Sequence, residues 1–270
     1  MSESKPKILA HHPLAYKNEE FLDSDEARTL RILAEYLEPL YRFEQQKVPG
    51  TVVFFGSARL AEDGPLAQYY AGARELARLY TTWTNALPPS SPRFLICSGG
   101  GHGIMEAANR GAAEAGGRTI GLNISLPEEQ SANPYITPDL SFEFHYFFMR
   151  KLWFAHLARA VVVFPGGFGT IDEMSEILTL SQTRKLEGKM TVILYGKQYW
   201  NEIINFDALV KHGVIGKDDL DLFSFASTPA EALETLKRGI APEMQAVAPA
   251  FAKTRTAQHG STYVYQRSGD

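Results

Sequence analysis

Short runs of β-branched and aromatic residues recur along the chain. They alternate with longer segments whose apolar residues are spaced three and four apart. The short runs predict buried strands, and the three- and four-residue spacing predicts helices that pack one face against those strands. After a first helix near residue 27, the expected strands are 51–55, 94–97, 119–124, 142–147, 161–164, 190–195 and 222–226. The expected helices between and after them are 66–80, 104–115, 150–159, 170–186, 199–212 and 230–239.

This alternation predicts an α/β fold with a doubly wound, mostly parallel sheet and helices on both faces. No internal repeat or second core is evident, so residues 49–240 form the expected single ligand-binding domain. Residues 1–48 form an N-terminal helical extension, and residues 241–270 form a polar tail that we expect to be flexible. The extension carries an apolar stripe that predicts a packing face, either on the domain or on a partner subunit: Ala27, Leu30, Leu33, Ala34, Leu37 and Leu40.

Composition excludes several classes of protein. A net charge of −4 without a basic run gives no footprint for nucleic acid. No apolar run approaches the ~20 residues of a membrane helix, and the polar start lacks a signal-peptide core. The single cysteine, Cys97, lies in an apolar run and reads as a buried structural thiol, which fits a reducing cytoplasm.

The most informative stretch is residues 161–173, where an apolar strand is followed by a Pro-Gly-Gly turn and then a helix that opens near Thr170. Glycines let the backbone approach a ligand, and the first N–H groups of a helix have no internal partner. With the helix dipole, they favour a phosphate. Two other glycine-bearing turns follow Phe55 and Cys97, and all three are expected at the carboxyl edge of the sheet, where such folds bind ligands.

Familiar motifs are missing. There is no complete G-x-G-x-x-G dinucleotide fingerprint and no P-loop. The chain also lacks a zinc-type cysteine pair, an H-E-x-x-H helix and a G-x-S-x-G elbow. We therefore expect neither a metal nor a cofactor, although a dinucleotide-dependent oxidoreductase stays a weaker alternative.

Two charged groups accompany the glycine loop. Glu173 follows Thr170 by three residues, which matches a helix capping box as well as a ligand-facing carboxylate. A carboxylate aimed past a phosphate would reach the sugar of a nucleotide, where glycosidic cleavage develops an oxocarbenium-like cation. Arg150 and Lys151 lie at an expected helix start, where cations are unfavourable unless an anion compensates them. They are either a solvated pair or ligand contacts.

These residues resemble the Lonely Guy (LOG) family. Residues 165–173 fit its PGGxGTxxE signature, and Met149-Arg150-Lys151 is similar to its upstream Arg-Lys motif. The turns at 54–58 and 98–105 are similar to its first two glycine turns. The resemblance covers about residues 50–240 and departs from the short members, which carry His-Glu or His-Gln where Phe148-Met149 precedes Arg150 here. Relatives are often labelled lysine decarboxylase, but no lysine here suggests a pyridoxal phosphate Schiff base.

The resemblance implies a Rossmann-like fold and a cytoplasmic phosphoribohydrolase that forms a homodimer or larger homo-oligomer. Such an enzyme hydrolyses a nucleoside 5′-monophosphate, here an AMP-like or cytokinin riboside 5′-monophosphate, to free base and ribose 5-phosphate. Arg150 and Glu173 would be the catalytic pair. The implied substrate-binding residues are Gly56, Ser57, Gly100, Gly101, Glu129, Lys151, Gly166, Gly167, Gly169 and Thr170. A non-catalytic nucleotide-binding sensor or carrier is the alternative, because it needs the loop but not the two charged groups.

Overall fold

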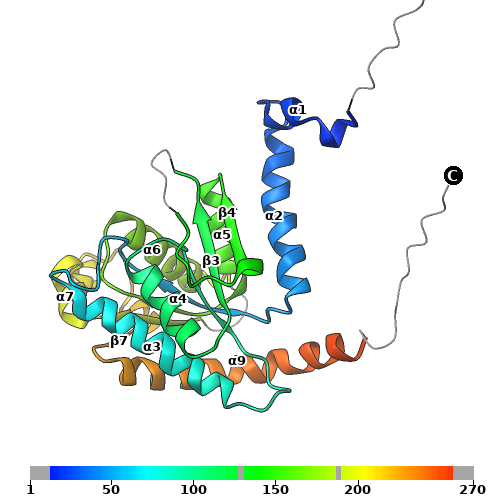
Figure 1. The fold of residues 1–270 in the computed structure, drawn as a ribbon. Coiled ribbons are helices and arrows are strands. Elements are labelled where there is room, and N and C mark those ends of the chain that lie inside the picture. The colour runs from blue at the N-terminus through cyan, green and yellow to red at the C-terminus, as the bar shows by residue number, and fades with distance from the viewer. Residues whose placement is uncertain (1–12, 127–130, 187–189, 258–270) are drawn as a thin grey trace, which may run out of the picture.

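The structure is a computed structural model that describes residues 13–126, 131–186 and 190–257, the last of these as backbone only from residue 246. Within these ranges, seven parallel strands form one sheet in the order β4-β3-β2-β1-β5-β6-β7 (Figure 1). Every pair of neighbours is parallel, which confirms the predicted doubly wound, Rossmann-like α/β fold. The strands are β1 (Thr51–Phe55), β2 (Leu95–Ser98), β3 (Thr119–Ile124), β4 (Ser141–Phe144), β5 (Ala158–Val163), β6 (Thr191–Tyr195) and β7 (Ser224–Ala226).

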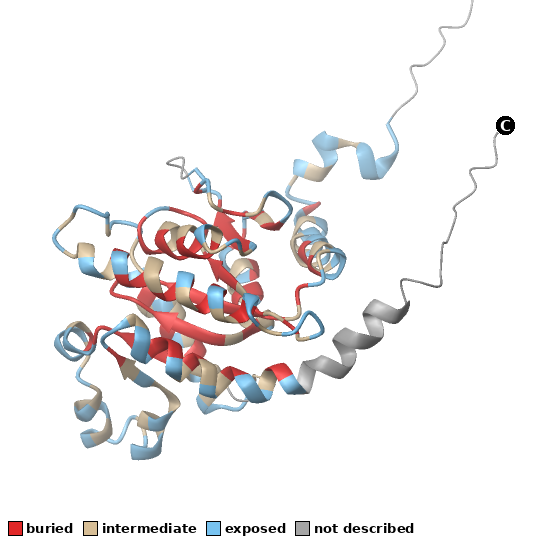
Figure 2. Ribbon diagram, turned by 60° about the horizontal axis from the view of Figure 1, so that its bottom comes forward, coloured by how far each residue is buried: buried red, intermediate tan, exposed pale blue. Residues whose placement is uncertain are grey.

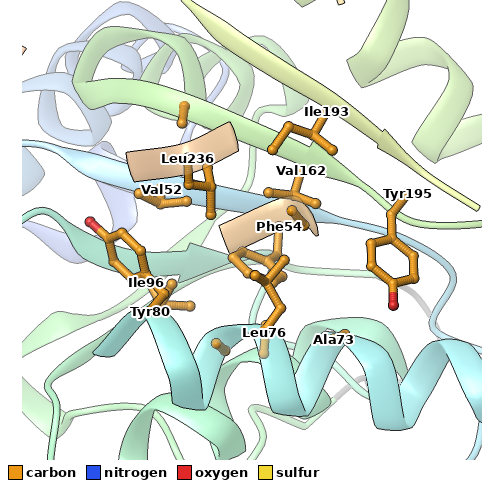
Figure 3. Packing of buried hydrophobic residues seen from close by; sticks show 14 of the residues in the cluster. Val52, Phe54, Ala73, Leu76, Tyr80, Ile96, Val162, Ile193, Tyr195 and Leu236 are labelled. Atoms are coloured by element: carbon orange, nitrogen blue, oxygen red, sulfur yellow. The ribbon is translucent and has the colours of Figure 1, made fainter. Parts of the chain in front are cut away.

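Two apolar clusters lie on the two faces of the sheet, because side chains alternate along each strand. In β1, Val52 and Phe54 belong to one cluster and Val53 and Phe55 to the other. Figure 3 shows the first cluster, where helical Leu76 packs near Phe54. The helices on that face are α3 (Ala67–Asn85), α4 (Ile104–Glu114) and α9 (Pro229–Ala257); α2 (Arg28–Gln45), α5 (Phe147–Leu157), α6 (Phe168–Gln182) and α7 (Lys197–Ile203) contribute to the other.

The chain reverses its winding direction between β1 and β5. It moves outward from β1 through β2 and β3 to β4, and then returns to place β5 directly beside β1. The loops after β1 and β5 therefore diverge at a switch point, where open α/β sheets leave a crevice at the carboxyl ends of the strands. Figure 2 shows the sheet in red, buried beneath its helices.

Several element boundaries differ from the sequence predictions. The helix α5 begins at Phe147, and residues 158–160 belong to β5 because they pair with β1 and β6. The predicted helix 199–212 is divided into α7 and α8 (Phe206–Lys211), since Ile204 is extended and the Asn205 side chain caps the second helix.

The last helix is also longer than predicted. Residues 241–257, which the sequence assigned to a polar tail, continue α9, and the buried side chains of Ile240 and Met244 hold this continuation against the domain. The rest of the predicted tail, residues 258–270, lies outside the described residues.

The N-terminal extension forms α1 (Glu19–Asp23) and α2, which stands against one side of the domain (Figure 1). Its predicted stripe is divided between two environments. Ala27 is buried, whereas Leu30, Leu33 and Leu37 are about half exposed, since α2 turns a different side, including Phe43, toward the domain. In the described residues, no helix is long and apolar enough to cross a membrane.

Candidate active site

A cleft of about 750 Å³ opens at the switch point. The loops after β1 and β5, the start of α6 and part of α5 form its walls. Most of the residues that the sequence singled out come together in its lining: Gly56, Ser57, Arg150, Gly166, Gly167, Gly169, Thr170 and Glu173.

The glycine loop after β5 is held by two hydrogen bonds to its backbone carbonyls. The Ser57 N–H donates to the Pro165 carbonyl at 3.1 Å, which ties the two loops together. The Tyr199 hydroxyl, from α7, donates to the Gly166 carbonyl at 2.9 Å. The helix α6 begins at Phe168 with Gly167 as its N-cap and has no side-chain cap. The first N–H groups of α6 therefore lack intrahelical partners beside the cleft, where an anion would satisfy them.

Two glycines of this loop differ in what a side chain would meet. A Cβ on Gly166 would collide with the Thr170 hydroxyl, whereas a Cβ on Gly167 has no atom within 4 Å. We expect Gly166→Ala to cost about 1–3 kcal/mol of stability, as overpacking does. Gly167→Ala should unfold like the wild type in a thermal melt, so that any loss of AMP affinity in this variant reports on the ligand. Equal loss of stability in both variants would contradict this assignment.

Arg150 and Glu173 form a buried ion pair on one wall of the cleft. Arg150 Nη2 lies 3.2 Å from Glu173 Oε1, and the two side chains are 12% and 13% exposed. Burial raises the pKa of Glu173 to about 7, although Arg150 acts to lower it. Arg150 Nε is buried and has no hydrogen-bond partner among the described residues. The pair thus offers a carboxyl poised near neutral pH and a cation beside it.

The capping-box interpretation of Glu173 is wrong. Because α6 begins at Phe168, Glu173 lies in its second turn, and the N-cap is Gly167. The Glu173 carboxylate accepts a hydrogen bond from Arg150. The sequence prediction had started the helix at Thr170, because a glycine pair normally ends regular structure rather than opening it.

Three of the expected substrate-binding residues lie elsewhere in the described structure. Lys151 pairs with Asp172 and Glu176 on α6, outside the lining of the cleft. Gly100 and Gly101 also lie outside that lining, and their carbonyls accept hydrogen bonds from the buried Asn133 side chain. Their turn reaches the cleft through Gly99, while Asn133 ties Gly100 and Gly101 to the segment that returns after β3. Glu129 falls outside the described residues.

Sequence reasoning missed Arg59 and Tyr199, which also line the cleft. Arg59 is exposed, and its guanidinium has no hydrogen-bond or ion-pair partner in the part of the chain that the structure describes. Its position two residues after Ser57, in the loop that follows β1, was the available signal. Tyr199 lies on α7, more than thirty residues after the glycine loop that it contacts, and no local sequence pattern marks it.

The fold and the cleft define a class: an α/β protein with a glycine-rich anion loop at its switch point and a buried Arg–Glu pair beside it. A family model described as "Possible lysine decarboxylase" matches residues 105–236. A probable cytokinin riboside 5′-monophosphate phosphoribohydrolase of rice, LOG4, is 30% identical over 150 residues, which cover 54% of this chain and 64% of the rice protein.

Two further relatives carry the same activity in their names. Arabidopsis thaliana LOG3 is 26% identical over 53% of this chain and 66% of its own length. The Rhodococcoides fascians enzyme is 28% identical over 56% of this chain and 83% of its own length. The chain thus spans less than two thirds of the two plant relatives it matches. Over these ranges it is similar to the LOG / lysine decarboxylase-like family.

Solved structures agree on the fold. The structural-genomics target TM1055 superimposes with a TM-score of 0.51 at 23% identity, covering 70% of this chain and 99% of its own. At that identity the likeness concerns the α/β fold alone.

Proposed function

We propose that this protein hydrolyses the N-glycosidic bond of a nucleoside 5′-monophosphate, releasing the free base and ribose 5-phosphate. The observation that carries the proposal is the buried Arg150–Glu173 pair in the same cleft as the Gly166–Gly167 loop. The loop suits a 5′-phosphate, and the pair suits the sugar and the bond to the base. The named activity of the relatives supports the same reaction.

The chemistry assigns one role to each group. The C1′–N bond breaks with its electrons leaving to the base, and the sugar develops positive charge that the Glu173 carboxylate stabilises. Water then adds to C1′ and gives one proton to Glu173, while the departing base takes up a proton from solvent. Glu173 then releases its proton to solvent, so that the net reaction consumes one water. A carboxyl whose pKa is raised to about 7 by burial is a stronger base than an exposed one. Arg150, which lies beside Glu173 in the cleft lining, holds the nucleotide or assists departure of the base.

The first experiment incubates the protein separately with AMP, GMP, CMP, UMP and isopentenyl-AMP, and follows free base and ribose 5-phosphate by chromatography. We expect base release from AMP or from isopentenyl-AMP, because both carry the adenine ring of the AMP-like and cytokinin substrates. Release from neither, with AMP still bound, would favour the nucleotide-binding sensor or carrier.

We propose that the Arg59 guanidinium binds the 5′-phosphate of the nucleotide. In the cleft lining, the Arg150 charge is already compensated by Glu173, whereas the Arg59 guanidinium has no partner among the residues that the structure describes. A hydrogen bond to a charged group contributes about 1.5–3 kcal/mol, which corresponds to roughly 10–100-fold in affinity. We expect Arg59→Ala to raise the KM for AMP by about that factor with little change in kcat, and to leave any cleavage of adenosine unchanged. Equal effects on AMP and adenosine would contradict the assignment.

We also propose that the protein forms a homodimer or larger homo-oligomer. Phe148 and Leu152 on α5 and Leu33 on α2 are exposed, and Phe168 beside the cleft is 95% exposed. Apolar surface of this kind marks interaction sites in soluble proteins. Light scattering after size exclusion should give at least twice the chain mass of 30.0 kDa. A monodisperse monomer would overturn this proposal.

A further inference from the structure

The N-terminal extension is joined to the helix that carries Arg150. Glu35, on α2, accepts hydrogen bonds at both carboxylate oxygens: Oε1 from the His145 N–H at 2.7 Å and Oε2 from the Tyr146 N–H at 3.2 Å. Tyr146 is the N-cap residue of α5, and that helix has no side-chain cap of its own. The Glu35 carboxylate thus binds the backbone N–H of the N-cap residue and of the residue before it, as the glutamate of a capping box binds the N-cap N–H.

A second set of contacts fixes α5 further along its length. The buried Trp153 indole donates its Nε1–H to the Glu35 carbonyl at 2.9 Å. The rings of Tyr36 and Phe43, both on α2, lie 5.6 Å and 5.3 Å from the Trp153 ring. Two turns of α2 therefore hold both the entry and the middle of α5.

A carboxylate near the N-terminus of α5 is electrostatically favourable. The helix carries Arg150 and Lys151 near its N-terminus and no acidic residue in its first turn. Cations there oppose the helix dipole, and a carboxylate at the N-terminus offsets that effect. Figure 1 shows α2 standing beside α5, although more than a hundred residues separate them.

The placement of Arg150 depends on the placement of α5. Its guanidinium lies 5.4 Å and 5.6 Å from the rings of Phe147 and Phe154 on the same helix, so the side chain moves with that helix. Its counterion, Glu173, belongs to α6. A small shift of α5 would therefore change the geometry of the pair.

We propose that Glu35 is a positioning residue for Arg150, and that the N-terminal extension is thereby part of the active-site scaffold. The inference rests on the proposed hydrolysis for its kinetic consequence, but not for its structural content. It also assigns a role to a segment that lies outside the region of family resemblance.

The test compares Glu35→Ala and Glu35→Gln with Glu44→Gln. Glu44 lies on the same helix and is exposed, and its side chain has no ion-pair or hydrogen-bond partner among the described residues, so its variant removes the same charge without breaking a side-chain contact. We expect Glu35→Ala to lower kcat for AMP about 10–100-fold with KM within about threefold, as misplacement of a catalytic group does. Glutamine keeps one acceptor oxygen and should restore part of the rate. Glu44→Gln should behave as the wild type.

A second readout does not need activity. Glu173 is faced by Arg150 and Lys151, which lower its pKa, and by Asp172 and Glu176, which raise it. If Arg150 withdraws in the Glu35 variants, the Glu173 carboxyl should titrate at higher pH by NMR. Loss of the Glu35 charge alone would shift that pKa downward, so the sign identifies the cause.

The outcomes distinguish a failure of the proposed hydrolysis from a failure of the positioning role of Glu35. If the wild type releases no base, the proposed function fails, and the NMR titration still decides whether Glu35 positions Arg150. An unchanged or lowered Glu173 pKa in both folded Glu35 variants, or an equal loss of kcat in Glu44→Gln, would overturn the inference. If Glu35→Ala does not fold, the glutamine variant gives the same comparison.

Discussion

Glu173→Gln is expected to abolish base release while making the protein more stable at alkaline pH. Glutamine keeps the shape of the side chain but can neither accept a proton from water nor stabilise the cation that develops at C1′. General base catalysis typically contributes about 10²–10⁴-fold, so kcat should fall by at least that factor while AMP still binds. The measurement is single-turnover base release together with AMP affinity. Turnover within threefold of the wild type would contradict the catalytic role.

The stability effect follows from the same carboxyl. Burial raises the pKa of Glu173 to about 7 from an ordinary value of 4.5. Between these values the folded protein retains a proton that the unfolded chain has lost, so stability falls as pH rises through this window. The loss is complete above pH 7 and amounts to about 3 kcal/mol at 1.36 kcal/mol per pKa unit. Glutamine does not ionise and escapes this loss.

Urea denaturation at pH 4, 6 and 8 tests this sign. The free energy of unfolding of Glu173→Gln should equal that of the wild type at pH 4. It should be higher than that of the wild type by part of the ~3 kcal/mol at pH 6, and by about all of it at pH 8. Asp172→Asn is the matched control, because Asp172 is an adjacent carboxylate whose side chain is 60% exposed. A Glu173→Gln variant less stable than the wild type at pH 8 would show that the ion pair is net stabilising.

The second large effect is expected for Arg150→Met. Methionine keeps much of the apolar stem but removes the cation that lowers the pKa of Glu173. In the wild type, kcat/KM should rise with pH through about 7 as the carboxylate forms. In Arg150→Met that rise should move to higher pH, and kcat/KM at pH 7 should fall about 10²–10³-fold, as loss of an electrostatic contact does.

The pH–rate profile between pH 5.5 and 9.5 measures both changes. Lys151→Met is the matched control, because Lys151 is the next residue but pairs with Asp172 and Glu176 outside the cleft lining. We expect a smaller loss and little displacement of the profile in that variant. If the acidic limb of the kcat/KM profile lies at the same pH in Arg150→Met and in the wild type, Arg150 does not lower the pKa of Glu173.

Much of the fold follows from the sequence alone. Residues 119–124 were predicted as a strand with the bounds that β3 has, because six apolar or small residues between a glycine pair and a proline leave few alternatives. The convergence of the turns after Phe55 and Phe164 was also predictable, since parallel strands end at one edge of a sheet. The glycine loop and its helix therefore needed no tertiary information to suggest a phosphate.

Local sequence patterns could not predict which charged and apolar side chains become buried. Arg150 and Glu173 are 23 residues apart, and either could have been a solvated surface group. The stripe on α2 was visible, but which of its sides faces the domain depends on Trp153, more than a hundred residues later.

The order of strands and helices, the parallel sheet and the glycine loop could be predicted from the residues alone, because local patterns of apolar residues and glycines indicate them. The Arg150–Glu173 pair, the raised pKa of Glu173, the open position of Arg59 and the contact of Glu35 with α5 emerge only in the folded chain. Each of these depends on distance and desolvation between segments that are far apart in sequence. Those quantities exist only once the helices have packed.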